Sequence, residues 1–138
     1  MLGSDIAMIF DCLIDIDKPD EEQKKAIEIT KKWALIAKET HNNSLQSLFG
    51  IVQGGLNLNL REQSAKSMID LNFDGYAIGG LAIGESREER KSVVEFLSNV
   101  LPVDKPRYVM GLGDTIGLID LIDSCLLYTS DAADDLLC

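Results

Sequence analysis

Four positions in this sequence carry groups that could hold a flat, polar ligand. Asp11 offers a carboxylate and Gln53 a carboxamide. The Gly79–Gly80 pair and Gly111 offer exposed peptide groups. A carboxylate accepts two N–H bonds from a planar edge, a carboxamide donates to a carbonyl oxygen, and glycine lets a ligand approach the backbone. Guanine presents N–H donors beside one carbonyl group, so the set suits a purine-like base, although it would also suit other amides and carbonyl compounds.

Each of these positions follows a short apolar run that leads through a turn into a helix-like stretch. The runs are Ile6–Phe10, Leu48–Val52, Tyr76–Ile78 and Tyr108–Met110. Parallel strands need long crossover connections, usually helices, so this alternation predicts an α/β fold with a parallel sheet. Ligands of such sheets bind at the carboxyl ends of the strands, which places all four positions at one edge. A closed barrel of such units needs eight strands, so these units do not complete one.

Capping signals and helical periodicity predict where the helices lie. Three pairs fit an N-cap with its partner three residues later: Asp20 with Gln23, Asn59 with Glu62, and Ser86 with Glu89. The first helix is expected to end near residue 41, with a buried stripe that includes Ile29, Trp33 and Ile36. We expect Trp33 in particular to lie in the core.

Charge and composition restrict the class of protein. The net charge of −10 argues against a free-standing nucleic-acid binder, because phosphate contacts need clustered Lys and Arg; for a fragment the argument is weaker. Cys12, Cys125 and Cys138 share no metal-ligand spacing with one another or with His41, which argues against a zinc site and a disulfide framework. No apolar run is long enough for a membrane span. We therefore expect a cytoplasmic protein without membrane contact.

Several long motifs resemble one known family. They are LGSDIAMIFD (residues 2–11), LFGIVQGG (48–55), Leu60-Arg61, FDGYAIGGLAIGE (73–85) and LPVDKPRYVMGLG (101–113). In this order and at these distances they are similar to the tRNA-guanine transglycosylase family, also called queuine tRNA-ribosyltransferases. The resemblance covers roughly residues 2–123. It implies that residues 1–124 form a partial (β/α)₈ TIM-type barrel of about four βα units.

The activity that the resemblance implies is a pentosyl transfer in queuosine biosynthesis. Family members exchange the wobble guanine of certain tRNAs for a deazaguanine base, using an Asp nucleophile and a second Asp that transfers protons. The Ser-Asp-Ser-Gly-Gly-Phe-Gln and Asp-Met-Phe-Asp-Cys segments that carry these two residues are absent from this sequence, as are the zinc ligands. We therefore expect this chain by itself to be inactive, and we expect zinc in the full-length parent. The expected partners are tRNA and a guanine or deazaguanine base, and the family's tendency to dimerise leaves a homodimer open.

The resemblance also implies roles for individual residues. The expected substrate-binding residues are Asp11, Gln53, Gly80, Leu81, Met110 and Gly111. Asp11 would bind the N–H edge of the base, while Gln53 and the backbone N–H of Gly80 would meet its carbonyl group. The backbone carbonyl of Leu81 would meet the substituent of the incoming base, and the last two residues would wall the pocket. The expected tRNA contacts are Gly111, Leu112, Gly113, Asp114, Thr115, Ile116 and Gly117.

Plainer roles stay open for the same residues. Asp11 also fits a capping carboxylate, Gln53 a loop tie, and the glycines simple turns. After Asp11 the sequence departs from the family, because Cys12, Leu13 and an acidic stretch replace the usual Glu-Cys and aromatic-proline loop. Two other functions therefore remain as alternatives. One is a non-catalytic tRNA-binding subunit, and the other is a different barrel enzyme that binds a phosphorylated metabolite through Gly111–Gly113.

The segment Cys125–Cys138 differs in character from the rest of the chain. It reads CLLYTSDAADDLLC, with no cap, no periodicity and no relation to the repeating unit. It resembles the in-frame translation of a sequencing-library adapter, so we expect residues 125–138 to be a non-native or disordered tail. An ordinary variable C-terminus is the alternative.

Overall fold

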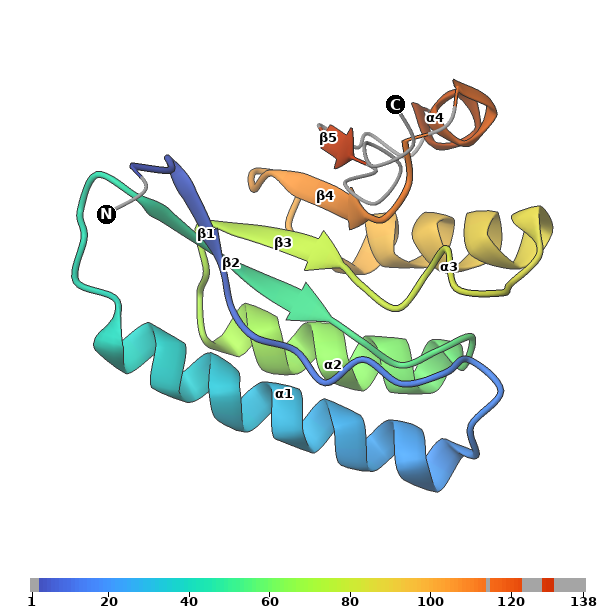
Figure 1. Ribbon diagram of the computed structural model, residues 1–138, viewed down its shortest axis with the longest axis horizontal. Coiled ribbons are helices and arrows are strands. Elements are labelled where there is room, and N and C mark those ends of the chain that lie inside the picture. Colours follow the sequence, from blue (N-terminus) through green and yellow to red (C-terminus); the bar gives the residue numbers. More distant parts are fainter. Residues whose placement is uncertain (1–2, 114, 123–127, 131–138) are drawn as a thin grey trace.

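The computed structural model describes residues 3–113, 115–122 and 128–130, in which strands and helices alternate as predicted (Figure 1). The elements are β1 (Ile6–Met8), α1 (Asp20–Thr40), β2 (Ser47–Val52), α2 (Leu58–Asp70), β3 (Gly75–Ile78), α3 (Arg87–Val100), β4 (Arg107–Met110), α4 (Thr115–Leu121) and β5 (Tyr128–Ser130). No helix within these ranges is long and apolar enough to cross a membrane.

The strands form one parallel sheet in the order β1-β2-β3-β4-β5. Each strand therefore lies beside the one that precedes it in the chain. The register pairs Val52 with Ile78, the last residues of β2 and β3. Because all the strands run the same way, their carboxyl ends lie along one edge of the sheet, where we expected the functional residues.

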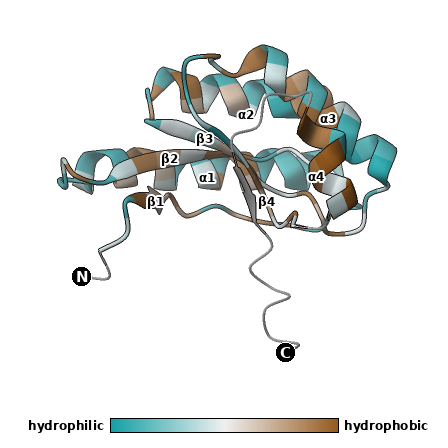
Figure 2. Ribbon diagram, turned by 90° about the horizontal axis from the view of Figure 1, so that it is seen from above, coloured by the Kyte–Doolittle hydropathy of each residue, from teal (hydrophilic) through white to brown (hydrophobic). Residues whose placement is uncertain are grey.

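The helices form a layer that follows the same order as the strands. Helix α1 packs against α2, α2 against α3, and α3 against α4. Figure 1 shows α1, α2 and α3 along one side of the sheet, and Figure 2 shows these helices banded with hydrophobic and hydrophilic residues, as expected for amphipathic helices. A doubly wound sheet would carry helices on both faces. This singly wound arrangement is that of a partial (β/α)₈ barrel, so the predicted fold class is confirmed.

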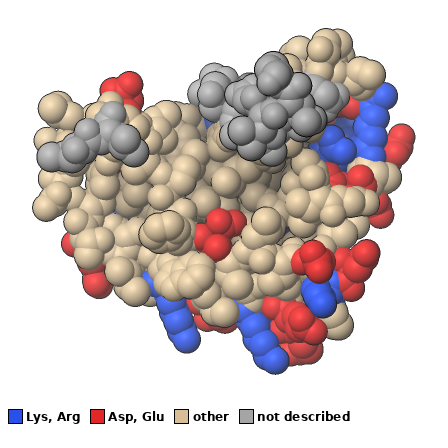
Figure 3. All heavy atoms as spheres, in the orientation of Figure 1, with Lys and Arg blue, Asp and Glu red and all other residues tan. Residues whose placement is uncertain are grey.

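The hydrophobic core lies between the sheet and the helix layer. Its fully buried side chains include Ala65 and Met68 from α2, Val94 and Leu97 from α3, and Val109 from β4. The opposite face of the sheet is partly bare, since Ile6 is 48% exposed and Met8 37%. Figure 3 shows the charged side chains mainly toward the edges formed by the helices, with a largely uncharged surface over the strands. In a closed barrel this uncharged face would be the interior.

Two of the three predicted helix caps are wrong in position. The capping box at Ser86 is present as predicted. Helix α1, however, has Pro19 as its N-cap, with no side-chain cap hydrogen bond, so Asp20 is already the first helical residue. Helix α2 is capped by Asn57 rather than Asn59, because the Asn57 side chain accepts the N–H groups of the second and third helical residues.

The buried stripe of α1 also differs from the prediction. Ile29 is 37% exposed, Trp33 40% and Ile36 55%, so none of the three lies in the core. The buried residues of this helix are Gln23, Ala26, Ile27, Thr30 and Ala34. Their mostly small side chains let α1 pack closely against its neighbours, whereas Trp33 lines a groove together with residues 8–10.

Strand β5 lies within the segment that we predicted to be a non-native or disordered tail. It pairs with β4, with Tyr108 opposite Tyr128. The remainder of 125–138 lies outside the described residues, and its origin stays a prediction.

Candidate functional site

Asp11 follows β1 at the carboxyl edge of the sheet. The strand pairing continues past β1, since the N–H of Ile9 donates to the carbonyl of Phe49 at 3.1 Å. One residue beyond Asp11, the N–H of Cys12 donates to Thr30 Oγ1 at 2.9 Å. Thr30 is fully buried in α1 and donates in turn to the carbonyl of Ala26. The loop that carries Asp11 is therefore attached to the sheet on one side and to α1 on the other.

Gln53 follows β2 directly and is 4% exposed. Its backbone N–H donates to Ser64 Oγ in α2 at 3.0 Å. Its side-chain Nε2 donates to Asp11 Oδ2, so the two side chains predicted to converge are in direct contact. Because one N–H of the carboxamide is used in this way, its second N–H remains for another acceptor.

Gly79 and Gly80 follow β3 and lie directly against Gln53. A Cβ on Gly79 would lie 2.7 Å from Gln53 Nε2, and a Cβ on Gly80 would lie 2.4 Å from Gln53 Oε1. The backbone of Gly80 has a φ of 66°, in the left-handed region that favours glycine. The close approach of this backbone to the carboxamide therefore requires glycine at both positions.

A pocket of about 720 Å³ opens at this edge of the sheet. Of the predicted substrate-binding residues, it is lined by Asp11, Gly80, Leu81, Met110 and Gly111. Gln53 is the exception, because it is buried and does not itself line the pocket, although its side chain contacts Asp11, which does. The structure therefore brings the predicted residues together at one concave site, which is the arrangement expected for a small-molecule pocket.

The predicted tRNA-contacting stretch has a mixed environment. Leu112 is 2% exposed and also lines the pocket, and Gly117 is buried in α4. Gly111, Gly113, Thr115 and Ile116 are exposed. Asp114 lies outside the described residues. Contact of this stretch with RNA stays a prediction.

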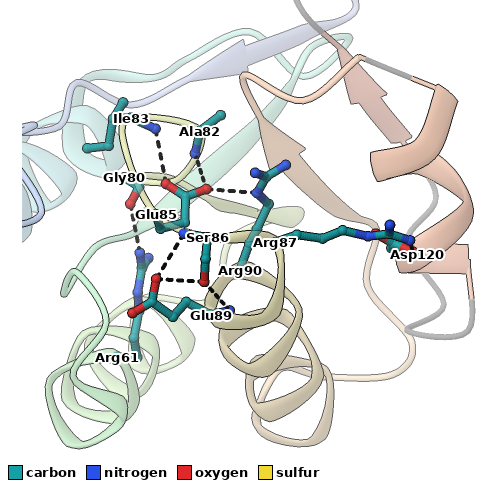
Figure 4. Close-up of polar contacts among 10 residues, drawn as sticks. All are labelled: Arg61, Gly80, Ala82, Ile83, Glu85, Ser86, Arg87, Glu89, Arg90 and Asp120. Carbon is teal, nitrogen blue, oxygen red and sulfur yellow. Dashed lines mark hydrogen bonds and ion pairs between the residues drawn. The ribbon is translucent and has the colours of Figure 1, made fainter.

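Glu85 is a pocket residue that the sequence reasoning did not single out. Its carboxylate accepts the backbone N–H groups of Ala82 at 2.7 Å and Ile83 at 3.1 Å. Arg90 from α3 donates to the same carboxylate at 2.7 Å, and the Glu85 side chain has no exposed area. Figure 4 shows these donors converging on Glu85 from the loop and from the helix. Residues 80–85 are therefore folded around one carboxylate.

These hydrogen bonds determine the charge state of Glu85. Burial by itself raises the pKa of a carboxyl group, but the N–H groups of Ala82 and Ile83 and the Arg90 guanidinium outweigh it, so the pKa of Glu85 lies below its ordinary value. Glu85 is consequently a carboxylate at neutral pH.

Arg61 is the second residue that the sequence reasoning missed, although it belongs to a quoted motif. It lies in α2 and is fully buried. Its guanidinium donates to four backbone carbonyls: those of Val52 at 3.0 Å, Gly55 at 2.8 Å, Gly79 at 2.6 Å and Gly80 at 3.1 Å. Burial lowers the pKa of Arg61 to about 9, and the nearby charge of Glu85 opposes that shift, so Arg61 is charged at neutral pH. No spacing rule signals such an arginine, because its partners are backbone groups.

The described residues do not fit a metal centre. Among them no group of three or more His, Cys, Asp or Glu side chains is placed to hold a metal ion.

Comparisons with known proteins agree with the motifs. A family model described as Queuine tRNA-ribosyltransferase matches residues 1–125. The Queuine tRNA-ribosyltransferase of Chromohalobacter salexigens is 41% identical over 143 residues, which cover 99% of this chain and 38% of the relative. That of Bacillus licheniformis is 50% identical over 120 residues, covering 86% of this chain and 32% of the relative. That of Thioalkalivibrio sulfidiphilus is 38% identical over 142 residues, covering 99% of this chain and 38% of the relative. The chain thus spans about a third of these relatives' length, from 32% to 38%.

Proposed function

This chain belongs to the queuine tRNA-ribosyltransferase family, and we propose that its parent protein exchanges the wobble guanine of a tRNA for a deazaguanine base. The observation that carries the proposal is the direct contact between Asp11 and Gln53 at the edge of a pocket whose lining includes Gly80 and Leu81. Family membership and the pocket geometry both support a site for a flat heterocycle.

In this proposal the base lies with its N–H edge on the carboxylate of Asp11. Its carbonyl oxygen accepts the second N–H of the Gln53 carboxamide and the backbone N–H of Gly80. The backbone carbonyl of Leu81 meets the substituent of the incoming base, and Met110 and Gly111 close the pocket wall. The N–H edge of the base then faces an acceptor of the protein, and its carbonyl oxygen faces donors, as binding in a desolvated pocket requires.

The chemical step itself is proposed to need segments that this chain does not contain. The nucleophile and the proton-transferring Asp belong to the two sequence segments that are absent here, and removal of a nucleophile costs many orders of magnitude in rate. The pocket residues of this chain are proposed to bind and orient the base. We propose that zinc, tRNA and any second subunit likewise bind to the parent protein rather than to this chain alone.

The test is base exchange by the intact parent protein. We expect it to incorporate radiolabelled guanine into unmodified tRNA, and we expect Asp11→Asn to reduce kcat/KM by at least about tenfold, because a hydrogen bond to a charged group contributes about 1.5–3 kcal/mol. The matched control is Asp17→Asn, which alters an exposed carboxylate in the same loop outside the pocket and should leave exchange unchanged.

Each alternative function predicts a different experimental result for the intact protein. An intact protein that binds tRNA and does not exchange guanine would identify the non-catalytic subunit. A thermal shift with a sugar phosphate, without any shift with guanine, would favour the phosphate-binding barrel. Exchange at wild-type rate by Asp11→Asn would contradict the proposed role of the carboxylate.

A further inference from the structure

We infer that Arg61 is a positioning residue whose guanidinium orients the backbone after β3 so that the N–H of Gly80 faces the base. The inference rests on the proposed function, since it concerns how the same pocket recognises the carbonyl group of its ligand. It adds a residue that does not line the pocket and that acts only through the peptide groups it binds.

The contact with Arg61 fixes the direction of the peptide group between Gly79 and Gly80. In a planar trans peptide the C=O and the following N–H point in opposite directions, and the described residues contain no cis peptide bond. The carbonyl of Gly79 points at Arg61 Nη1, which lies 2.6 Å away. The N–H of Gly80 belongs to the same peptide group and therefore points away from Arg61, toward the side of the loop on which the pocket lies.

The N–H of Gly80 differs from the N–H of Gly79 in its hydrogen bonding. The N–H of Gly79 is used in the sheet, where it donates to the carbonyl of Val52 at 3.0 Å. No acceptor within the described part of the chain takes the N–H of Gly80, and Gly80 lines the pocket. A polar group held in this way is prepared for an acceptor on the ligand, because its orientation does not have to change on binding.

The geometry of the guanidinium explains why an arginine is needed at position 61. The guanidinium carries five N–H donors in a rigid plane and here reaches carbonyls at the ends of β2 and β3 together. A lysine ammonium has three donors around one point and cannot span the same set. Figure 4 shows Arg61 rising from α2 to the carbonyl of Gly80, directly below the loop that Glu85 organises. The loop is therefore held both by the Arg61 guanidinium and by the Glu85 carboxylate.

The experiment compares two bases in the intact parent protein. Guanine carries the carbonyl group that the Gly80 N–H would meet, whereas 2-aminopurine lacks it. Calorimetric titration of Arg61→Lys should give a guanine affinity reduced roughly threefold to tenfold, the range for one hydrogen bond. The affinity for 2-aminopurine should change by less than about twofold, because that base makes no bond to the misplaced N–H.

The matched control is Arg107→Lys. Arg107 is 6% exposed and donates to the carbonyl of Ser98 at 2.8 Å, so the substitution also removes a buried guanidinium, but at the amino end of β4 and away from the pocket. Both affinities should remain at the wild-type level. If Arg61→Lys does not fold, Arg61→Gln is measured by the same criteria, since it keeps two N–H donors without the charge.

Three results would overturn the inference. Equal loss of affinity for both bases in Arg61→Lys would indicate a general structural role, and an unchanged affinity for guanine would show that the Gly80 N–H does not depend on Arg61. In either case the wild-type protein still binds guanine, so the proposed function stands. A wild-type protein that binds neither guanine nor a deazaguanine would remove the proposed function and this inference together.

Discussion

Gly80 is constrained by its own backbone and by a neighbouring side chain. Its φ is 66°, and a Cβ would lie 2.4 Å from Gln53 Oε1. We predict that Gly80→Ala destabilises the intact protein by about 1–2 kcal/mol, the cost of a left-handed conformation for a residue with a Cβ. It should also reduce guanine exchange at least about tenfold, because Gln53 must move away from Asp11 and lose its hydrogen bond. Chemical denaturation and the exchange assay measure the two effects.

Gly3→Ala is the control that separates strain from displacement. Gly3 also has a positive φ, 72°, but it lies outside the pocket, and no atom of the described residues lies within 4 Å of the Cβ that would be added. This variant should lose stability and keep most of its exchange activity. Equal loss of activity in both variants would mean that backbone strain alone, rather than the position of Gln53, limits the reaction.

The polar residues at strand ends could be predicted because strand polarity alone places them together. Asp11 and Gln53 were expected to converge, and their side chains are in contact. Glu85 and Arg61 could not be predicted in the same way, since their partners are backbone N–H and C=O groups whose directions depend on the loop conformation. Ala82, for example, has a positive φ of 60°, and the residue type alone does not predict this loop conformation.

At the scale of elements, the loop between β3 and α3 depends on one ionised carboxyl group. The pKa of Glu85 is lowered from 4.5 in the folded protein, so the folded state favours the carboxylate. Its contribution to stability is therefore complete above this unfolded value and is lost as the pH falls below it. We predict that the difference in unfolding free energy between wild type and Glu85→Gln is constant from about pH 7 to pH 5 and narrows below about pH 4.5.

Urea denaturation of both proteins across this range measures the difference. Glutamine resembles the protonated carboxyl group, so the two curves should approach each other in acid. A gap between wild type and Glu85→Gln that stays constant at low pH would contradict the role given to this carboxylate.

The order of strands and helices could be predicted, and the details of helix α1 could not. Apolar runs separated by amphipathic stretches determine the βα alternation regardless of exact caps. The buried side of α1 depends instead on how closely its backbone approaches the sheet, and small residues such as Ala34 allow an approach that the Trp33 side does not. Periodicity alone could not distinguish these two neighbouring sides of the helix.

At the scale of the whole molecule, the chain is part of a barrel with one face uncovered. The side chains of Ile6 and Met8 are partly exposed, and a groove of about 590 Å³ runs over the sheet face that they share with Phe49 and Tyr108. Relatives of this family are much longer, because the matched region covers 32% to 38% of their length. We propose that the remaining part of the parent barrel covers this face and supplies the catalytic aspartates.

The most direct test of the proposed site is a crystal structure of the intact parent protein with guanine bound. We expect the base to lie in the pocket at the carboxyl edge of the sheet, with its N–H edge on the Asp11 carboxylate and its carbonyl oxygen on the N–H of Gly80. Guanine bound elsewhere, or bound in this pocket with Asp11 turned away from it, would contradict the claim that the ends of these strands form a base-binding site.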